Sequence, residues 1–246
     1  MKATVICFSP TGNSRKSALA MANAVADTVE VIDLTAAAAL RIIPASELAI
    51  FAAPVYGGRI PAVARERFEA ISGSNTPCLI VASYGNRHYD DALLEMADLA
   101  RENGFIVKGG AAVIGRHTYG EIQIDRPNAA DLTEMADFAR RAVAKPADAP
   151  EFVIPGNRPY KDGGKGGKFR PLTGDACVHC GLCARECPTH AIEGDHITVS
   201  EGCISCFRCI RSCPVHAKHM DTPEYNGFAA MFTEKLKERR ENEFFL

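Results

Sequence analysis

Eight cysteines in the C-terminal part of the chain stand in two copies of one pattern. The first copy is Cys177, Cys180, Cys183 and Cys187, and the second is Cys203, Cys206, Cys209 and Cys213. Each run reads C-x2-C-x2-C-x3-C and is followed by a proline. Three thiolates in one short run can wrap one face of a metal–sulfur centre, because each C-x2-C turn directs its side chains toward a common point. The pattern therefore predicts thiolate-bound metal chemistry.

This spacing resembles the signature of bacterial two-cluster ferredoxins, in which the fourth cysteine of each run ligates the other run's cluster. The resemblance implies two [4Fe–4S] clusters with crossed ligation. We assign one cluster to Cys177, Cys180, Cys183 and Cys213, and the other to Cys203, Cys206, Cys209 and Cys187.

Three other interpretations of the cysteine runs stay open at this point. Zinc usually takes two C-x2-C pairs or a mixed Cys/His set, whereas here a third cysteine follows each pair at the same spacing. Disulfides require an oxidising compartment, to which nothing in the chain points. The clusters could also serve a structural rather than a redox role.

A second group of residues has the chemistry of a phosphate site. Ser9-Pro10-Thr11-Gly12-Asn13-Ser14 follows the first apolar run and opens the first helical pattern. Hydroxyl groups, a glycine and free helix N–H groups at such a junction can hold a phosphate. Because this segment carries no lysine, it favours a monoester over a triphosphate. An ordinary helix-capping turn is the alternative.

Two later loops follow apolar runs in the same way. Pro54-Val55-Tyr56-Gly57-Gly58 comes after the third run, and Ser83-Tyr84-Gly85-Asn86 comes after the fourth and continues to Tyr89. Loops at the carboxyl ends of parallel strands converge at the crevice where open α/β sheets bind ligands. Aromatic side chains beside glycines suit a flat ring, which needs stacking faces and close backbone.

These three loops resemble those of flavodoxins, and together with the cysteine runs the chain resembles flavodoxin–ferredoxin fusion proteins over nearly its whole length. The resemblance implies FMN as cofactor. It assigns the phosphate to Ser9, Thr11, Gly12, Asn13 and Ser14, and one side of the ring to Tyr56, Gly57 and Gly58 beside Pro54. The other side falls to Tyr84, Gly85, Asn86 and Tyr89 beside Ser83. The chain has no Trp, so ring stacking would fall to tyrosine.

The elements that must position these residues follow from the hydrophobic pattern. Residues 1–145 alternate strand-like and helix-like segments, which predicts a parallel sheet covered on both faces. We expect a flavodoxin-like five-stranded parallel sheet, an α/β fold, with a smaller α+β ferredoxin domain. The expected strands are 3–9, 29–34, 48–55, 77–83 and 105–114, and the expected helices are 13–27, 61–71, 89–103 and 128–145.

The rest of the chain divides by composition. Residues 146–172 are rich in proline and glycine and predict a linker or draped arm, residues 173–219 form the ferredoxin domain, and residues 220–246 hold a C-terminal helix and tail. We expect that helix at about 226–241. Its apolar stripe of Phe228, Met231, Phe232 and Leu236 favours docking on the chain's own body. The apolar end Phe244-Phe245-Leu246 would dock likewise or form an interface.

Three groups of isolated residues leave smaller questions. The segment His117-Thr118-Tyr119-Gly120 follows the fifth strand and could approach the flavin. His117 itself could supply a proton to a substrate or only make surface hydrogen bonds. Arg59 and Arg87 lie in the flavin loops and would either offset anionic charge or face solvent. Cys7 and Cys78 fall inside apolar strands and are expected to be buried small hydrophobes.

The overall charge bounds the choice of partners. Formal net charge is −2 over 246 residues, which gives no basis for binding nucleic acid or a membrane surface. Clusters and a flavin phosphate would add negative charge, so a redox partner protein is expected to present a basic patch. The opening residues run directly into a strand, and no long apolar stretch follows, so we expect a cytoplasmic protein of undetermined oligomeric state.

The chemistry favours a soluble electron-transfer protein that moves electrons between two clusters and FMN. A ferredoxin-fed, FMN-dependent oxidoreductase acting on a small molecule is the first alternative, and a redox sensor is the second. The absence of G-x-G-x-x-G leaves binding of a nicotinamide dinucleotide without support. The sequence does not identify the catalytic residues, the donor, the acceptor or the direction of electron flow.

Overall fold

The predicted apolar runs form the buried strands of a central sheet. The computed structural model describes residues 1–146 and 152–246, and in it five strands run parallel in the order β2-β1-β4-β6-β7. They are β1 (Lys2–Cys7), β2 (Thr28–Asp33), β4 (Leu48–Pro54), β6 (Thr76–Tyr84) and β7 (Phe105–Ile114). This strand order is that of flavodoxin-like sheets, which confirms the expected fold class.

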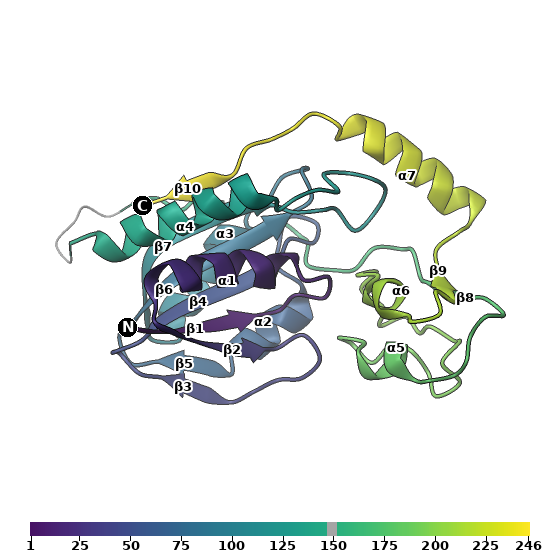
Figure 1. Ribbon diagram of the computed structural model, residues 1–246, viewed down its shortest axis with the longest axis horizontal. Coiled ribbons are helices and arrows are strands. Elements are labelled where there is room, and N and C mark those ends of the chain that lie inside the picture. The colour runs from purple at the N-terminus through teal and green to yellow at the C-terminus, as the bar shows by residue number, and fades with distance from the viewer. Residues whose placement is uncertain (147–151) are drawn as a thin grey trace.

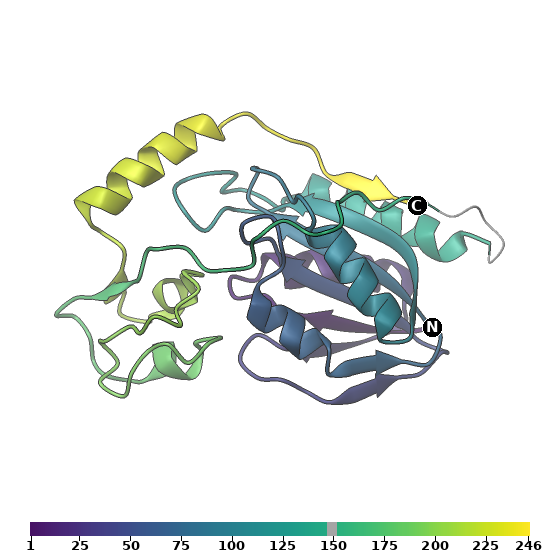
Figure 2. The same cartoon turned by 180° about the vertical axis from the view of Figure 1, so that it is seen from behind.

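Helices cover both faces of the sheet. Helices α1 (Asn13–Val25) and α4 (Ala129–Ala144) lie on one face, and α2 (Ala62–Phe68) and α3 (Ala92–Glu102) lie on the other (Figures 1 and 2). Each face has its own apolar core, one including Met21 and Phe138 and the other including Phe68 and Leu93. With both sides covered, Cys7 and Cys78 are fully buried, as predicted.

A sixth strand corrects the expectation of five strands. Strand β10 (Glu243–Phe245), at the very end of the chain, pairs antiparallel with β7, with Phe244 opposite Ala111. The Phe244 ring stacks on Phe138 of α4 with ring centroids 5.0 Å apart. The apolar tail therefore covers an open sheet edge, which would otherwise present unpaired backbone groups.

The C-terminal helix starts and stops earlier than expected. Helix α7 spans Pro223–Lys235. Thr222 caps it by accepting a hydrogen bond from the Tyr225 N–H (3.2 Å), and Pro223 occupies the first helical position, where its missing N–H costs nothing. Beyond Lys235 the chain extends back along the first domain to β10 (Figure 1).

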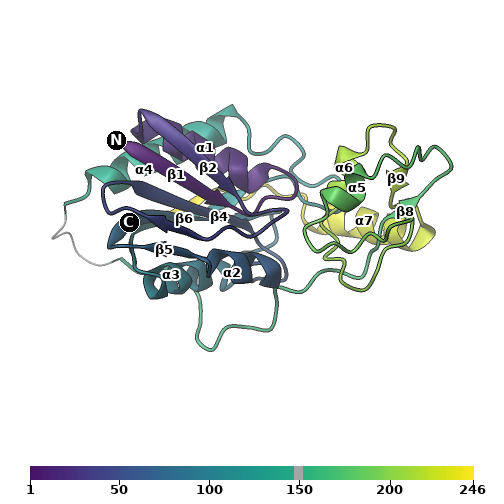
Figure 3. The same cartoon turned by 90° about the horizontal axis from the view of Figure 1, so that it is seen from below.

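The cysteine-rich module sits beyond the carboxyl ends of the parallel strands (Figure 3). It contains two short helices, α5 (Leu182–Arg185) and α6 (Arg208–Ser212), and the two-stranded sheet of β8 (Leu172–Thr173) and β9 (Lys218–His219). A second small sheet, of β3 (Arg41–Ile43) and β5 (Ile71–Gly73), lies on the first domain.

Among residues 1–146 and 152–246, no helix is both long enough and apolar enough to cross a membrane.

Candidate functional site

The first loop brings its polar side chains together at the start of α1. Gly12 has φ +89°, a left-handed conformation that glycine adopts at little cost, and the helix begins at Asn13. The Ser14 and Ser83 hydroxyls lie 2.6 Å apart, which joins this loop to the end of β6. The Ser9 Oγ accepts a hydrogen bond from the Arg15 N–H at 3.1 Å. Hydroxyl groups from two strand ends thus converge at one helix N-terminus.

A cavity of about 310 Å³ opens at this point, between the first domain and the cysteine-rich module. The described residues that line it are Ser9, Pro10, Thr11, Asn13, Ser14, Pro54, Val55, Tyr56, Gly57, Ser83, Tyr84, Gly85, Gly115, Arg116, His117, Thr118, Tyr119, Lys165, Gly166, Gly167, Ile204 and Ser205. None of these lining residues is acidic, and two carry positive charge. This balance suits an anionic ligand.

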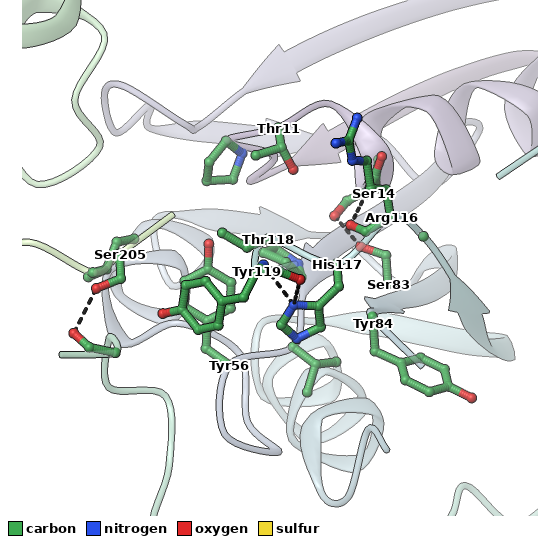
Figure 4. Close-up of a pocket in the computed structure, with 18 of the residues that line it drawn as sticks. Thr11, Ser14, Tyr56, Ser83, Tyr84, Arg116, His117, Thr118, Tyr119 and Ser205 are labelled. Atoms are coloured by element: carbon green, nitrogen blue, oxygen red, sulfur yellow. Dashed lines mark hydrogen bonds between the residues drawn. The ribbon is translucent and has the colours of Figure 1, made fainter. Parts of the chain in front are cut away.

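The two ends of the cavity differ in chemistry (Figure 4). Ser14, Ser83 and Arg116 gather at one end, while Tyr56, Tyr119 and Ser205 lie at the other. One end offers hydroxyl donors and a guanidinium to a phosphate, and the other offers aromatic side chains to a flat ring. The residues present therefore fit FMN.

The structure brings most of the predicted flavin residues together. The lining includes Ser9, Thr11, Asn13, Ser14, Pro54, Tyr56, Gly57, Ser83, Tyr84 and Gly85. Four predicted residues, Gly12, Gly58, Asn86 and Tyr89, do not line it. The Gly58 carbonyl instead accepts a hydrogen bond from the Asp91 N–H at 3.0 Å, which ties this loop to the start of α3.

Asn86 and Tyr89 hold the C-terminal tail rather than the cavity. The buried Asn86 side chain donates to the Leu236 and Glu238 carbonyls (2.8 and 2.6 Å) and accepts from the Arg240 N–H (3.2 Å). The Tyr89 hydroxyl donates to Glu243 at 2.9 Å. Both side chains satisfy backbone or carboxylate groups of the tail, so the expected contact with a ring is replaced by a structural role.

Tyr84 contributes to the cavity wall but does not present its ring there. Its ring is buried in the core against Tyr89, with centroids 5.4 Å apart, and points away from the cavity (Figure 4). The second aromatic side chain of the cavity is Tyr119, which follows the fifth parallel strand. Its position after a strand end is the same signal that indicated the other loops, although the sequence did not assign the ring to Tyr119.

Arg59 and Arg87 do not reach the cavity. Arg59 forms an ion pair with the buried Glu95 at 2.6 Å, and Arg87 forms one with Asp90. The cationic groups at the cavity are instead Arg116 and Lys165. Neither Arg59 nor Arg87 is therefore placed to offset the negative charge of a ligand in the cavity.

His117 lines the cavity as a neutral imidazole. Burial lowers the pKa of its side chain to about 4, more than the hydrogen bond to the Tyr119 backbone raises it. The Nδ1 atom lies 2.8 Å from the Tyr119 backbone nitrogen and 3.2 Å from the Tyr119 carbonyl oxygen, so the backbone of this loop holds the ring in place. A Cβ added at Gly85 would lie 2.1 Å from this ring, so glycine is needed there.

The His117 pKa predicts a dependence of stability on pH. The pKa of His117 in the folded protein lies below the value of about 6.5 expected in the unfolded chain. The stability that the neutral imidazole contributes is therefore fully present above pH 6.5 and is lost as the pH falls toward 4. By pH 5.5 the loss should be about 1.4 kcal/mol. Chemical denaturation measures the free energy of unfolding at pH 7.5 and at pH 5.5. The difference between these two values should be smaller for His117→Gln than for wild type. Equal differences would contradict the buried neutral state.

The eight cysteines ring two separate small cavities, each of about 20 Å³. The first cysteine set, Cys177, Cys180, Cys183 and Cys213, lines one cavity. The second cysteine set, Cys203, Cys206, Cys209 and Cys187, lines the other. Each set takes three cysteines from one run and the fourth from the other run. This grouping matches the crossed sets inferred from the resemblance.

Donor groups around both sets suit sulfur ligands. Backbone N–H groups of Ala191, Ser205 and Ala217 point at the sulfurs of Cys187, Cys203 and Cys213, at 3.2–3.4 Å. Among the described residues, two buried nitrogens that lack a hydrogen-bond partner, His196 Nδ1 and Arg208 Nε, belong to residues lining the two cavities. Such groups can donate to the sulfides of a cluster, whose potential depends on these bonds.

The geometry weighs against zinc. Within the described parts of the chain, no three histidine, cysteine or acidic side chains lie close enough together to hold one metal ion. Each set instead joins three cysteines of one run with the fourth of the other, which is the grouping of two-cluster ferredoxins. Burial raises the pKa of Cys206 to about 12, so a thiolate there needs the positive charge of a bound metal centre. The donor sets thus fit iron–sulfur clusters.

The second cysteine set lies at the domain boundary. Ile204, between Cys203 and Cys206, lines both the second set's cavity and the large cavity. Arg208, which also lines the second set's cavity, donates to the Pro10 carbonyl in the phosphate loop at 3.0 Å. Arg67 of α2 donates to the Pro188 carbonyl at 2.6 Å. Two arginines thus tie this set to the first domain.

Comparison with protein families supports the description of the cysteine-rich module. Residues 174–193, which include the first cysteine run, match the family of 4Fe-4S binding domains. No curated protein matches the chain.

Solved structures similar to the N-terminal part include three flavodoxins. Oxidised flavodoxin 1 from Bacillus cereus aligns with 18% identity and a TM-score of 0.44, over 60% of this chain and 100% of its own. A flavodoxin from the domain Archaea aligns with 20% identity and a TM-score of 0.41, over 58% of this chain and 99% of its own. A flavodoxin from Streptococcus pneumonia TIGR4 aligns with 20% identity and a TM-score of 0.41, over 59% of this chain and 100% of its own. These similarities are too distant to carry an argument about the fold. The strand order of the sheet establishes it. The chain joins a flavodoxin-like α/β domain to a 4Fe-4S binding module.

Proposed function

We propose that the protein transfers electrons between two [4Fe–4S] clusters, held by the first and second cysteine sets, and FMN held in the large cavity. The observation that carries this proposal is that Ile204 lines both the large cavity and the cavity of the second cysteine set. The second set therefore lies directly against the large cavity. FMN, when bound, can exchange one or two electrons, whereas a cluster exchanges one at a time. Thiolate ligands require a reducing compartment, and we therefore place the protein in the cytoplasm.

The residues at the phosphate end would orient the cofactor. Ser9, Thr11 and Ser14 offer hydroxyl groups, and the Arg116 guanidinium beside them offers positive charge to a phosphate. At the other end, Tyr56 and Tyr119 offer aromatic faces, and Gly57 lets backbone approach the ring closely. The neutral His117 adds no charge to this end.

The arm and the module cover part of the cavity, which favours a carrier over an enzyme that acts on a small molecule. The arm residues Lys165–Gly167 and the module residues Ile204 and Ser205 form part of its wall. These groups stand at the aromatic end, where a small substrate would have to meet the ring. The Ser205 hydroxyl lies 2.7 and 2.6 Å from the Gly167 and Phe169 carbonyls, which fixes arm and module together.

Anaerobic single-turnover and steady-state assays test the assignment. For single turnover, the loaded protein is reduced with dithionite, freed of excess reductant and mixed with a basic one-electron acceptor protein such as cytochrome c. For steady state, it is mixed with a panel of small-molecule acceptors in excess dithionite, beside a blank that lacks the protein. We expect rapid oxidation by the protein acceptor and no sustained turnover of the small molecules. Turnover of a small acceptor without a second protein would instead identify an oxidoreductase. A protein that reacted with neither, but changed shape on oxidation, would be a sensor.

A further inference from the structure

The two cysteine sets differ in their relation to the large cavity. The second set shares Ile204 with it, whereas the first set's described lining has no residue in common with it. Cys206 of the second set is 7% exposed, while Cys180 of the first set is exposed. One set therefore faces inward to the domain boundary, and the other faces solvent.

One tyrosine reinforces the inward position of the second set. Tyr119 lines the large cavity, and its ring packs on Phe207, which lines the second set's cavity, with ring centroids 5.3 Å apart. The two cavities are therefore connected by an aromatic contact as well as by Ile204.

The solvent side of the first set carries an apolar patch. Its members are Leu172, Val178, Ile197 and Val215, which are 44%, 61%, 47% and 37% exposed. Val178 and Val215 line the first set's cavity. The Ile197 carbonyl lies 3.4 Å from Lys218 Nζ and 3.5 Å from the Thr173 hydroxyl, which connects Ile197 to the same cavity wall and to the strand that holds Leu172. Val178 and Val215 thus border the first cluster site, and Ile197 lies beside its wall.

Carboxylates outnumber cationic side chains around this patch. Asp175, Glu193 and Asp195 are exposed carboxylates in the segments that frame the first set, against the exposed Arg185 and the buried Lys218. Each [4Fe–4S] centre with four thiolates would add further negative charge. An apolar centre with an acidic surround complements a protein surface that is apolar in the middle and basic at its edge.

We propose that the first cysteine set is the port at which a basic one-electron carrier protein docks, and that the second set relays electrons between this port and the large cavity. The inference rests on the proposed function and adds the order of the centres and the docking face. With clusters bound, each transfer would move one electron from a reduced cluster at the first set, which would be oxidised, to the carrier, which would be reduced. No bond would break. A cluster at the second set would then pass one electron to the first set, and FMN in the large cavity would supply the electron that the second set loses.

Ile197→Lys tests the port with a matched control. It places a cation in the patch, and Val153→Lys places one at a side chain that is 83% exposed on the arm, outside all three described cavities. With cytochrome c as the basic probe, Ile197→Lys should slow electron transfer by about tenfold at low salt, because steering of this kind depends on local charge. Val153→Lys should match wild type.

Potentiometric titration followed by electron paramagnetic resonance gives a readout that does not depend on docking. The Ile197→Lys cation should raise the midpoint potential of one cluster and leave the flavin midpoint unchanged. A shift of the flavin midpoint as large as that of the cluster, or equal slowing in both lysine variants, would overturn the proposed order. If wild type contained clusters and FMN but passed no electron to cytochrome c, the proposed function itself would fail. If wild type passed electrons and Ile197→Lys matched it, only the port would fail.

Discussion

Replacing Asp131 with asparagine is expected to lower the free energy of unfolding by about 3–5 kcal/mol, because it leaves the Arg126 guanidinium buried without its counter-charge. Both side chains are fully buried. Arg126 Nε lies 3.1 and 3.0 Å from the two Asp131 carboxylate oxygens, and Nη2 makes a further contact with Oδ1. Burial opposes the ionised carboxylate, but these hydrogen bonds outweigh it and hold the pKa of Asp131 below its usual value.

The same carboxylate joins three parts of the chain. Asp131 caps α4 through the Asn128 N–H at 2.8 Å and accepts from the Asn242 side chain, next to β10, at 3.1 Å. The Arg126 carbonyl accepts from the Arg116 N–H at 2.9 Å, which anchors the loop carrying His117 and Tyr119. The variant should therefore also loosen the cavity wall and weaken FMN binding.

Asp137→Asn on the same helix is the matched control. Asp137 pairs with Arg140 at the surface, with 61% of its side chain exposed, so its loss should cost about 0–1 kcal/mol. Denaturant titration of the loaded proteins measures both changes. Similar small losses for the two variants would show that the buried pair contributes no more than a surface pair.

Replacing Gly166 with alanine is expected to separate the arm from the cysteine-rich module. A Cβ at this position would lie 2.3 Å from the Ile204 Cα and 2.7 Å from its carbonyl carbon. Because these are backbone atoms, they cannot turn aside as a flexible side chain would. We expect FMN binding to weaken by about tenfold, or about 1.4 kcal/mol. Reduction of the flavin through the clusters should also become slower, because Ile204 separates the large cavity from the second set's cavity.

Gly194→Ala controls for adding a methyl group to a glycine of the module, since nothing lies within 4 Å of the position that its Cβ would take. Titration with FMN and stopped-flow flavin reduction by a reduced ferredoxin should give wild-type values for this control. Wild-type affinity and rate in Gly166→Ala would show that the arm does not hold the two domains in register.

Much of the fold could be predicted because each strand of a doubly covered sheet is a continuous apolar run. The five parallel strands fall within two residues of their predicted bounds for this reason. Strand β10 could not be predicted in the same way, because three residues carry no period and their partner, β7, lies far away in the sequence. The expected helix end at about 241 was wrong because the tail must extend to reach that edge.

The candidate site was predictable where its residues sit next to strand ends. Ser9, Ser14, Tyr56 and Gly57 line the cavity because local sequence places them at those junctions. Asn86 and Tyr89 belong to the same kind of loop, yet they contact the tail, and sequence alone does not reveal that competing partner. The contribution of Ile204 and Ser205 depends on how the module docks, which follows from contacts between distant segments such as Arg208 and Pro10.

Anaerobic purification followed by joint determination of iron, sulfide and flavin is the most direct test of the central claim. Two filled cysteine sets and one filled cavity predict about eight iron, about eight sulfide and one FMN per chain. Colourless protein after careful anaerobic reconstitution, or zinc in place of iron, would contradict it.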